Sequence, residues 1–316
     1  MGKTEDVILD YLSQPEVFAD LFNGYVFNGK QVIESEQLKE MDGKARLLLD
    51  NDSGKQGTYE VVRRERDIVR EAVIGEQRIR LMVCGVEQQT NVDYSMPLRV
   101  LAYDTLEYLK QAKQIEQGHR KKKDVSGKEF LSMFTKEDRL IPTITILFYT
   151  GKETWDGALE LSGLFGDTGY AKELAPCMVK APLNLISIYD VKYTEKYHSS
   201  LRKIFEILPF VDSKEELEGY LDCHQEEYSS IDSAAARVLS LLMDLEISVK
   251  DTQYKEEGGN MCKAIEEIRQ SSRAEGLAEG KQQIIQNMLN KGLSPEEVAN
   301  LTDVPLETVQ SIAANQ

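Results

Sequence analysis

Apolar residues near the start of the chain recur at the spacing of an α-helix. The pattern covers residues 5–23 and is formed by Val7, Ile8, Tyr11, Leu12, Val17, Phe18, Leu21 and Phe22. Pro15 lies inside this pattern, and because proline interrupts a helix interior, we predict two short helices. Residues 31–50 are more polar and are interpreted as a connector, with a weak helix at residues 35–41.

The hydrophobic period changes to that of β-strands between residues 58 and 89. Residues 58–73 are rich in β-branched side chains with charged ones between them, and residues 78–89 contain an apolar run from Leu81 to Val86. Residues 75–77 separate the two runs and predict the turn of a β-hairpin. The nearly unbroken second run indicates a strand in the centre of a sheet.

A long amphipathic helix is predicted to begin at Pro97, because proline fits the first helical turn. Its apolar side is expected to comprise Leu98, Leu101, Ala102, Leu106 and Leu109. A basic loop follows. Then come buried strands at residues 140–149 and 183–189 and helical segments at residues 199–250 and 261–291. This order of elements predicts a mixed α/β fold.

The C-terminal end of the chain predicts two short helices that resemble a helix-turn-helix. Ser294, Pro295 and Glu297 have the pattern of a capping box at the start of the first helix, and residues 303–305 separate it from the second. Residues 292–316 contain no lysine or arginine. We therefore favour a packing or self-association module, and with it a homo-oligomer, over a module that reads DNA.

The length of 316 residues is typical of two units or of one large unit with an appendage. We expect an α/β domain at residues 1–195, a helical extension at residues 196–258, and a C-terminal helix with a small helical tail at residues 259–316. No apolar run approaches the roughly 20 residues that cross a bilayer, so no membrane partner is expected. The four cysteines form no C-x-x-C pair and are interpreted as reduced thiols of a cytoplasmic protein.

The net charge of −16 is unusual for a DNA-binding protein, because such proteins are generally basic where they contact phosphate. One basic cluster stands out, and it contains Arg120, Lys121, Lys122 and Lys123. These side chains are candidates for phosphate contacts, with an ordinary solvated loop as the alternative.

Asp67 and Glu87 are the residues on which the chemical argument depends. If the hairpin turns on residues 76–78, Asp67 lies directly opposite Glu87, and the two Cβ atoms are about 5 Å apart. Gln89 is two residues further on and shares the face of Glu87. Carboxylates this close repel each other unless a cation lies between them, and oxygen ligands suit Mg²⁺ or Mn²⁺. Such an ion activates water for attack on a phosphodiester.

Other interpretations of these carboxylates stay open. Glu87 can be an exposed strand end, and Asp67 can form a surface ion pair with Arg63, Arg64 or Arg66. The geometry also depends on the length of the turn, because a slip of one residue moves Asp67 to the other face of the sheet.

Several stretches of the chain occur in an order that resembles a known family. They are Arg66-Asp67, Val86 to Thr90, and Tyr94 to Arg99 with Tyr103, together with residues 18–23, 29–33, 147–157 and 273–281. An aspartate, a Glu-x-Gln strand and a Met-Pro-x-Arg helix start resemble the Rpn family. Its members are recombination-promoting nucleases, also described as transposases of the PD-(D/E)XK nuclease superfamily.

This resemblance implies a restriction-endonuclease-like mixed sheet core flanked by helices. It also implies cleavage of DNA with Mg²⁺ or Mn²⁺, linked to recombination or a mobile element. Asp67 and Glu87 would be the metal carboxylates, and Gln89 would stand where the wider superfamily has lysine. Asp20 is either a further acidic ligand or a helix-packing hydrogen bonder. Arg99 either contacts a phosphate or pairs with Glu87 or Asp93.

Two functions fit these observations. The first is a metal-dependent DNA endonuclease, which the set Asp67, Glu87 and Gln89 favours. The second is a DNA-binding or assembly protein that keeps the nuclease fold with little catalysis. The acidic charge and the absence of the lysine favour this second function.

Overall fold

The computed structural model of the chain describes residues 3–41, 44–50, 59–65, 67–86, 92–166, 169, 171–243 and 280–314. The chain divides into two compact units, Met1–Cys223 with Asp232–Glu257 and His224–Ile231 with Gly258–Gln316. The first unit has the predicted mixed α/β character, and the second is helical where it is described. The three-part division expected from the sequence stays a prediction.

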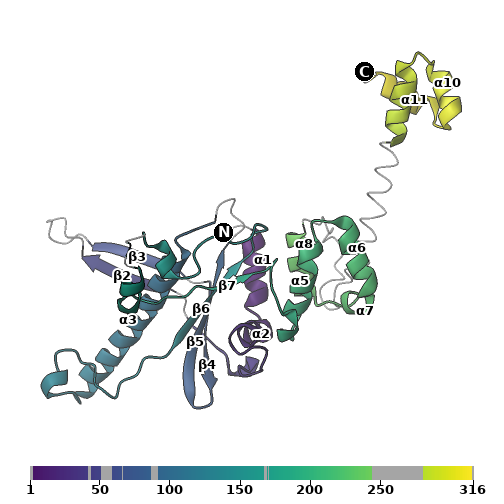
Figure 1. Ribbon diagram of the computed structural model, residues 1–316. Coiled ribbons are helices and arrows are strands. Elements are labelled where there is room, and N and C mark those ends of the chain that lie inside the picture. The colour runs from purple at the N-terminus through teal and green to yellow at the C-terminus, as the bar shows by residue number, and fades with distance from the viewer. Residues whose placement is uncertain are drawn as a thin grey trace. The chain divides into compact units, whose positions relative to one another are not determined.

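A five-stranded mixed sheet forms the centre of the first unit (Figure 1). Its strands, in spatial order, are β1 (Lys39–Glu40), β4 (Ile68–Ile74), β5 (Gln77–Val86), β6 (Thr143–Tyr149) and β7 (Asn184–Ser187). β1, β4 and β5 are antiparallel neighbours, whereas β5, β6 and β7 run parallel. Leu81, Met82 and Val83 of β5 are completely buried, which confirms the prediction of a central strand.

A second, two-stranded sheet pairs β2 (Lys44–Asp50) with β3 (Tyr59–Glu65) in antiparallel register. Two sequence predictions are wrong in this region. Residues 58–73 do not form one strand, and residues 31–50 contain η1 (Ser35–Gln37), β1 and β2 rather than a connector with one weak helix. The spacing of apolar residues did not predict this pairing. A short strand is stabilised mainly by side-chain contacts with the neighbouring strand, and these contacts cannot be read from the sequence of one strand.

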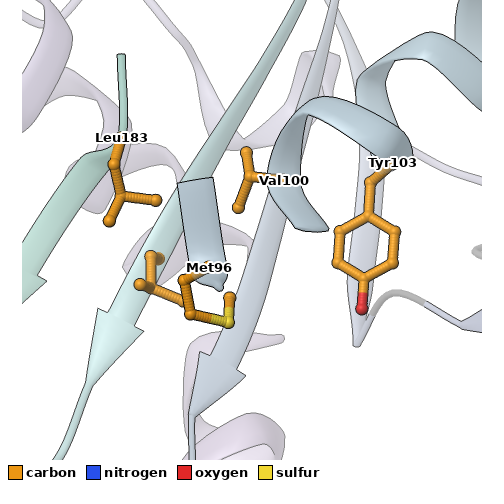
Figure 2. Close-up of a cluster of buried hydrophobic side chains, with 5 residues drawn as sticks. Met96, Val100, Tyr103 and Leu183 are labelled. Carbon is orange, nitrogen blue, oxygen red and sulfur yellow. The ribbon is translucent and has the colours of Figure 1, made fainter. Parts of the chain in front are cut away.

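Helices cover both faces of the five-stranded sheet (Figure 1). α3 (Met96–Lys122) packs on one face (Figure 2), where Met96 and Val100 share a buried hydrophobic cluster with Leu147 of β6. The next residue, Phe148, points to the other face, and its ring centroid lies 6.3 Å from that of Phe205 in α5 (Leu201–Ile207). α1 (Lys3–Leu12) and α2 (Pro15–Val26) lie on this second face and are two separate helices, as predicted.

The buried face of α3 differs from the predicted apolar side. Leu98 and Leu109 are 53% and 49% exposed, whereas Glu107 and Gln111 are buried. Gln111 accepts a hydrogen bond from the amide of Ile141 (2.7 Å) and donates one to its carbonyl (3.2 Å), and Glu107 forms an ion pair with Arg80. Because these polar side chains find partners on β5 and on the backbone just before β6, they occupy core positions that a hydrophobic pattern would assign to leucine.

The remaining helices of the first unit are short. They are η2 (Gly127–Glu129), η3 (Leu161–Leu164), α4 (Ala171–Leu174), η4 (Ala175–Cys177), η5 (Thr194–Lys196), η6 (Leu208–Phe210), α6 (Lys214–Cys223) and α8 (Ser233–Leu242). None of the helices in the described ranges has both the length and the apolar character needed to span a membrane.

The second unit contains α7 (Gln225–Tyr228), α10 (Pro295–Thr302) and α11 (Leu306–Ala314), and residues 280–290 are also helical. Ile285, Val298 and Val309 form a buried hydrophobic cluster in this unit. The predicted capping box is confirmed. The amide of Glu297 donates to the hydroxyl of Ser294 (3.4 Å), and the amide of Ser294 donates to the carboxylate of Glu297 (2.9 Å).

Candidate functional site

The hairpin that was expected to align Asp67 with Glu87 has a different register. β4 and β5 are joined by a two-residue turn at Gly75 and Glu76, so that Ile74 pairs with Gln77 and Ile68 with Val83. Gly75 has a φ of +62°, a conformation that glycine adopts readily and that permits this tight turn. The predicted three-residue turn is therefore wrong. If the ladder continued by one residue, Asp67 would lie opposite Cys84 rather than Glu87.

The change of register also removes the expected alignment of faces. It shifts the pairing by three residues, an odd number, so two regular strands would direct Asp67 and Glu87 to opposite faces of the sheet. Asp67 has left the ladder, however. It lies half-buried in a bend between β3 and β4. Glu87 and Gln89 lie outside the described residues, so their contribution to a metal site stays a prediction.

The segments that carry the predicted site residues nevertheless lie near one end of the sheet. Val86, Tyr149 and Ser187 are register partners at the carboxyl ends of β5, β6 and β7, and we call this the carboxyl end of the sheet. Asp67 directly precedes β4, whose antiparallel pairing with β5 brings its first residue toward the same end. Ligands of open α/β sheets bind beyond the carboxyl ends of parallel strands.

α3 begins at this end because it runs antiparallel to β6. The hydroxyl of Thr145 donates to Asp104 (2.6 Å), and Gln111, further along the helix, bonds the backbone just before β6. The start of α3 therefore packs near the end of β6, in the apolar cluster that contains Met96 and Leu147 (Figure 2). This arrangement places Arg99, one of the predicted site residues, at the carboxyl end of the sheet.

Arg99 is held in a defined position by two neighbours. Its guanidinium donates to the carboxylate of Asp93 and to the hydroxyl of Tyr103 (3.1 Å). Asp93 also accepts hydrogen bonds from the amide (2.9 Å) and the hydroxyl (2.6 Å) of Ser95. The pairing with Asp93, one of the alternatives from the sequence, is confirmed. The side chain of Arg99 is still 42% exposed, so part of the cation faces solvent.

Electrostatics keep this pair charged. Burial by itself raises the pKa of Asp93, but hydrogen bonds from Ser95 and Arg99 outweigh it and bring the pKa below its ordinary value. Burial likewise lowers the pKa of Arg99, while Tyr103 and Asp93 raise it, and the balance is a raised pKa. The result is a fixed, permanently charged guanidinium that can donate to an anionic group.

The segment after β6 packs at the same end. The hydroxyl of Tyr94 donates to Asp156 (3.1 Å), and the rings of Tyr149 and Trp155 meet edge to face with centroids 5.3 Å apart. A Cβ atom on Gly151 would collide with the ring of Tyr149, which explains the glycine. Residues 147–157, one of the stretches that resemble the family, therefore pack beside the start of α3.

The sequence identified Arg99 and its alternative pairing with Asp93, but it gave no role for Tyr94, Tyr103 and Asp156. Local spacing held part of the signal: Asp93-x-Ser95 is a common side-chain-to-backbone turn, and Arg99 and Tyr103 are four residues apart on a helix. The contact of Tyr94 with Asp156 joins residues 62 positions apart and has no such local signal.

Asp20 has a structural role in the described geometry. It is buried on α2, and its carboxylate accepts hydrogen bonds from the amide of His198 (2.9 Å) and from the amide (2.8 Å) and hydroxyl (2.6 Å) of Ser199. These bonds join α2 to the segment before α5. The helix-packing alternative thus describes Asp20, and the role of an additional metal ligand has no support from these contacts.

The basic cluster lies at the far end of α3, and the prediction that it forms a loop is wrong. Arg120, Lys121 and Lys122 form the last helical turn, and Lys123 ends the helix with a φ of +53°. Cations at this position are stabilised by the negative end of the helix dipole. The spacing of apolar residues contains no information about this effect. With 27 residues, α3 is about 40 Å long, so the cluster is remote from the carboxyl end of the sheet.

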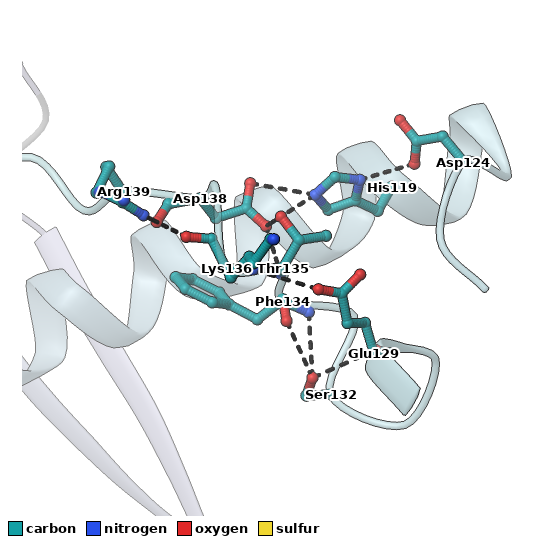
Figure 3. A network of polar contacts seen from close by, with 9 residues as sticks. All are labelled: His119, Asp124, Glu129, Ser132, Phe134, Thr135, Lys136, Asp138 and Arg139. Atoms are coloured by element: carbon teal, nitrogen blue, oxygen red, sulfur yellow. Dashed lines mark hydrogen bonds and ion pairs between the residues drawn. The ribbon is translucent and has the colours of Figure 1, made fainter. Parts of the chain in front are cut away.

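His119 fastens the neighbouring loop to this end of α3 (Figure 3). Its Nδ1 lies 2.7 Å from Asp124, and its Nε2 lies 3.0 Å from Asp138. Hydrogen bonds to Asp124 and then Asp138 raise the pKa of His119, because both ring nitrogens can donate only when the imidazole is protonated. Asp138 is oriented in turn by the amide of Thr135 (2.7 Å).

A pocket of about 580 Å³ lies elsewhere in the first unit, between η3 and η4. Its wall is mainly apolar and includes Phe165, Leu174 and Met178, with Glu160 and Lys180 among its polar members. None of the predicted site residues that the structure describes lines it.

No three histidine, cysteine, aspartate or glutamate side chains form a metal-binding group among the residues that the structure describes. Glu87 is not among those residues. Comparison of the chain with protein-family models, with curated proteins and with solved structures finds no match.

Proposed function

We propose that the chain is a divalent-metal-dependent DNA endonuclease of the Rpn family, linked to recombination or a mobile element. The observation that carries the proposal is the meeting of several segments at the carboxyl end of the sheet. Asp67 precedes β4, Glu87 is the residue after the end of β5, and α3 begins nearby with Arg99 held by Asp93. The mixed sheet with helices on both faces is compatible with the core that the family resemblance implies.

The residues of this end would share the work of cleavage. Asp67 and Glu87 would hold Mg²⁺ or Mn²⁺, since hard cations prefer carboxylate oxygens. When bound, the ion supplies an activated water and neutralises charge on the phosphodiester. Gln89 would orient the attacking water through its amide. Arg99 would donate to a phosphate oxygen beside the scissile bond, with Asp93 and Tyr103 keeping its guanidinium in place.

The observed register restricts how Asp67 and Glu87 could reach the same metal ion. If the ladder were extended by one residue, the position opposite Asp67 would be that of Cys84, three residues before Glu87, or about 10 Å away along a regular strand. The proposal therefore requires the chain after Val86 to bring the carboxylate of Glu87 back toward the bend that holds Asp67. Measurement of Mn²⁺ binding to variants of Asp67 and Glu87 tests this requirement directly.

A second candidate function is DNA binding or assembly with little catalysis. The register favours it specifically, because continued regular strands would separate the two carboxylates. The presence of Gln89 in place of a lysine also favours it, because glutamine brings no positive charge.

A plasmid-nicking assay distinguishes the two functions. The full chain is incubated with supercoiled plasmid and Mg²⁺, Mn²⁺ or EDTA, next to the variants Asp67→Asn and Glu87→Gln. Controls with the same chemical change at exposed positions are Asp222→Asn and Glu76→Gln, the latter at the opposite end of the same hairpin. The endonuclease proposal predicts metal-dependent nicking that falls by about 100-fold or more in both site variants and in neither control.

Two results would change the conclusion. If no metal supports nicking but the protein still binds DNA, the second function replaces the first. If nicking persists in both Asp67→Asn and Glu87→Gln, the activity comes from another site or another protein, and the assignment of these carboxylates is wrong.

A further inference from the structure

The turn at residues 130–133 presents two large apolar side chains to solvent. Phe130 is 58% exposed and Leu131 is 93% exposed. Single exposed hydrophobic residues are common on protein surfaces, but adjacent ones at the tip of a loop are candidates for insertion into a partner. We call this pair the apolar tip.

The apolar tip stands on an ordered base rather than on an unstructured loop (Figure 3). The amide of Met133 donates to the carbonyl of Glu129 (2.9 Å), and the hydroxyl of Ser132 donates to the carbonyls of Glu129 (3.3 Å) and Phe134 (3.2 Å). Met133 itself is 7% exposed and anchors the turn. An ordered base lowers the entropy cost of inserting the tip into a partner.

The loop that carries the tip begins and ends beside the basic cluster. His119, one residue before the cluster, bonds Asp124 at the start of the loop and Asp138 at its end (Figure 3). The tip therefore belongs to the same surface as the last turn of α3. We call residues 119–140 the distal surface, because α3 separates it from the carboxyl end of the sheet.

The charge of the distal surface differs from that of the whole chain. Residues 119–140 contain seven lysine and arginine residues and four aspartate and glutamate residues, a formal charge of +3, in a chain of net charge −16. Arg120 is paired with Glu116 (2.8 Å), but in the described ranges Lys121, Lys122 and Lys123 take part in no ion pair and are exposed. An exposed cluster of cations attracts anionic molecules and raises their local concentration.

We propose that the distal surface binds double-stranded DNA, with Lys121, Lys122 and Lys123 on the phosphates and the apolar tip inserted as a wedge that distorts the duplex. Cations beside an apolar wedge are the combination by which DNA-bending proteins kink their target. The choice of DNA as the partner rests on the proposed function. The binding itself requires neither the metal nor cleavage.

The length of α3 suits a duplex that reaches both ends of the helix. Arg99 and Lys121 are separated by about 33 Å along the helix axis, at 1.5 Å per residue, and by about 40° around it, so they lie on the same side of the helix. This separation is close to one helical turn of B-DNA, after which the same backbone faces the protein again. A duplex bound at the carboxyl end of the sheet could thus also contact the distal surface, whereas a flat membrane offers no such repeat.

Binding is tested with the full chain in EDTA, so that cleavage plays no part. The probe is a duplex of roughly 30 base pairs with a donor and an acceptor dye at its ends, which reports binding by anisotropy and bending by energy transfer. We expect Phe130→Ser/Leu131→Ser to lower the affinity about tenfold, which corresponds to about 1.4 kcal/mol, and to abolish the bend. The matched control is Leu159→Ser/Val179→Ser, whose side chains are 58% and 61% exposed, and it should bind and bend DNA as the wild type does.

The lysines are tested through the salt dependence of binding. Lys121→Gln/Lys122→Gln/Lys123→Gln should reduce the slope of log K against log salt by about 3, because each lost phosphate contact removes roughly 0.9. Lys180→Gln/Lys192→Gln/Lys214→Gln changes three exposed lysines outside the distal surface and should leave the slope unchanged. The variant that lacks the apolar tip should also keep the wild-type slope, because the tip contacts no phosphate.

Several outcomes would overturn this inference. One is wild-type bending by the Phe130→Ser/Leu131→Ser variant, and another is a salt slope that does not respond to loss of the three lysines. A third is that the protein binds vesicles containing phosphatidylserine but not DNA, and that this binding depends on the three lysines and the apolar tip. If plasmid nicking fails while binding and bending depend on the distal surface as expected, the inference stands and the nuclease proposal does not.

Discussion

Replacement of Asp20 by asparagine separates a structural role for this residue from a metal-binding one. The carboxylate accepts bonds from the amides of His198 and Ser199 and from the hydroxyl of Ser199. One carboxylate oxygen accepts from all three donors, so an asparagine can keep its own oxygen there, but its NH₂ group then faces the amide of His198 and the negative charge is lost. The isosteric substitution Asp20→Asn therefore weakens these bonds without leaving a cavity.

The magnitude follows from the loss of the negative charge on the acceptor. A hydrogen bond to a charged group contributes about 1.5–3 kcal/mol and one between neutral groups about 0.5–1.5 kcal/mol, so each of the three bonds loses about 1 kcal/mol. Because the donors are only partly buried, we expect Asp20→Asn to lower the free energy of unfolding by about 2–4 kcal/mol. For a unit of this size the melting temperature should fall by roughly 5–15 °C.

The assay is thermal unfolding followed by circular dichroism, together with plasmid nicking well below the melting temperature. Asp10→Asn on the adjacent helix α1 is the matched control, because Asp10 is exposed. We expect a large loss of stability only in Asp20→Asn, with metal-dependent nicking retained. An unchanged melting temperature with abolished nicking would refute the structural role and make Asp20 part of the metal site.

Three further predictions concern other parts of the chain. Arg99→Lys should slow plasmid nicking by about tenfold, because lysine cannot keep the planar contacts to both Asp93 and Tyr103; Arg202→Lys, in the exposed pair with Glu206, should have no effect on the nicking rate. The pKa of His119 is raised in the folded state. The stability that protonated His119 contributes to the fold is therefore complete below the unfolded-state pKa of 6.5 and is lost as the pH rises through the folded-state pKa. A proton NMR titration should give a pKa above 6.5 that falls in Asp124→Asn, and an unshifted pKa in the wild type would contradict the bridge to both carboxylates. Ser294→Ala should destabilise the start of α10 by about 0.5–2 kcal/mol in hydrogen exchange, whereas Ser311→Ala should not.

Features that depend on local chemistry were predictable from the sequence. Pro15 marks the break between α1 and α2, and Ser294 with Glu297 marks the start of α10. The apolar run from Leu81 to Val86 correctly predicted the buried strand β5. In each case a residue acts on its own neighbourhood, through a fixed φ, a side-chain bond to the backbone or a hydrophobic period.

Features that depend on distant partners were not predictable in this way. The pairing of β2 with β3 and the burial of Glu107 through Arg80 depend on residues brought together by the fold. The hairpin register was missed for a subtler reason: one residue at Gly75 decides between a two-residue and a three-residue turn, and every pair in the ladder follows that choice. The alignment of Asp67 with Glu87 was inferred from facing residues, so it was wrong by the same three residues as the register.

The central claim is that Asp67 and Glu87 hold one divalent cation between them. Titration of Mn²⁺ into the full chain, followed by the EPR signal of free Mn²⁺, measures this for the wild type, Asp67→Asn, Glu87→Gln and the double variant. We expect one site that is weakened by either substitution, with a double variant that binds about as weakly as each single one, because a shared ion couples its ligands. Single variants that bind Mn²⁺ as the wild type does, or losses that simply add, would contradict it.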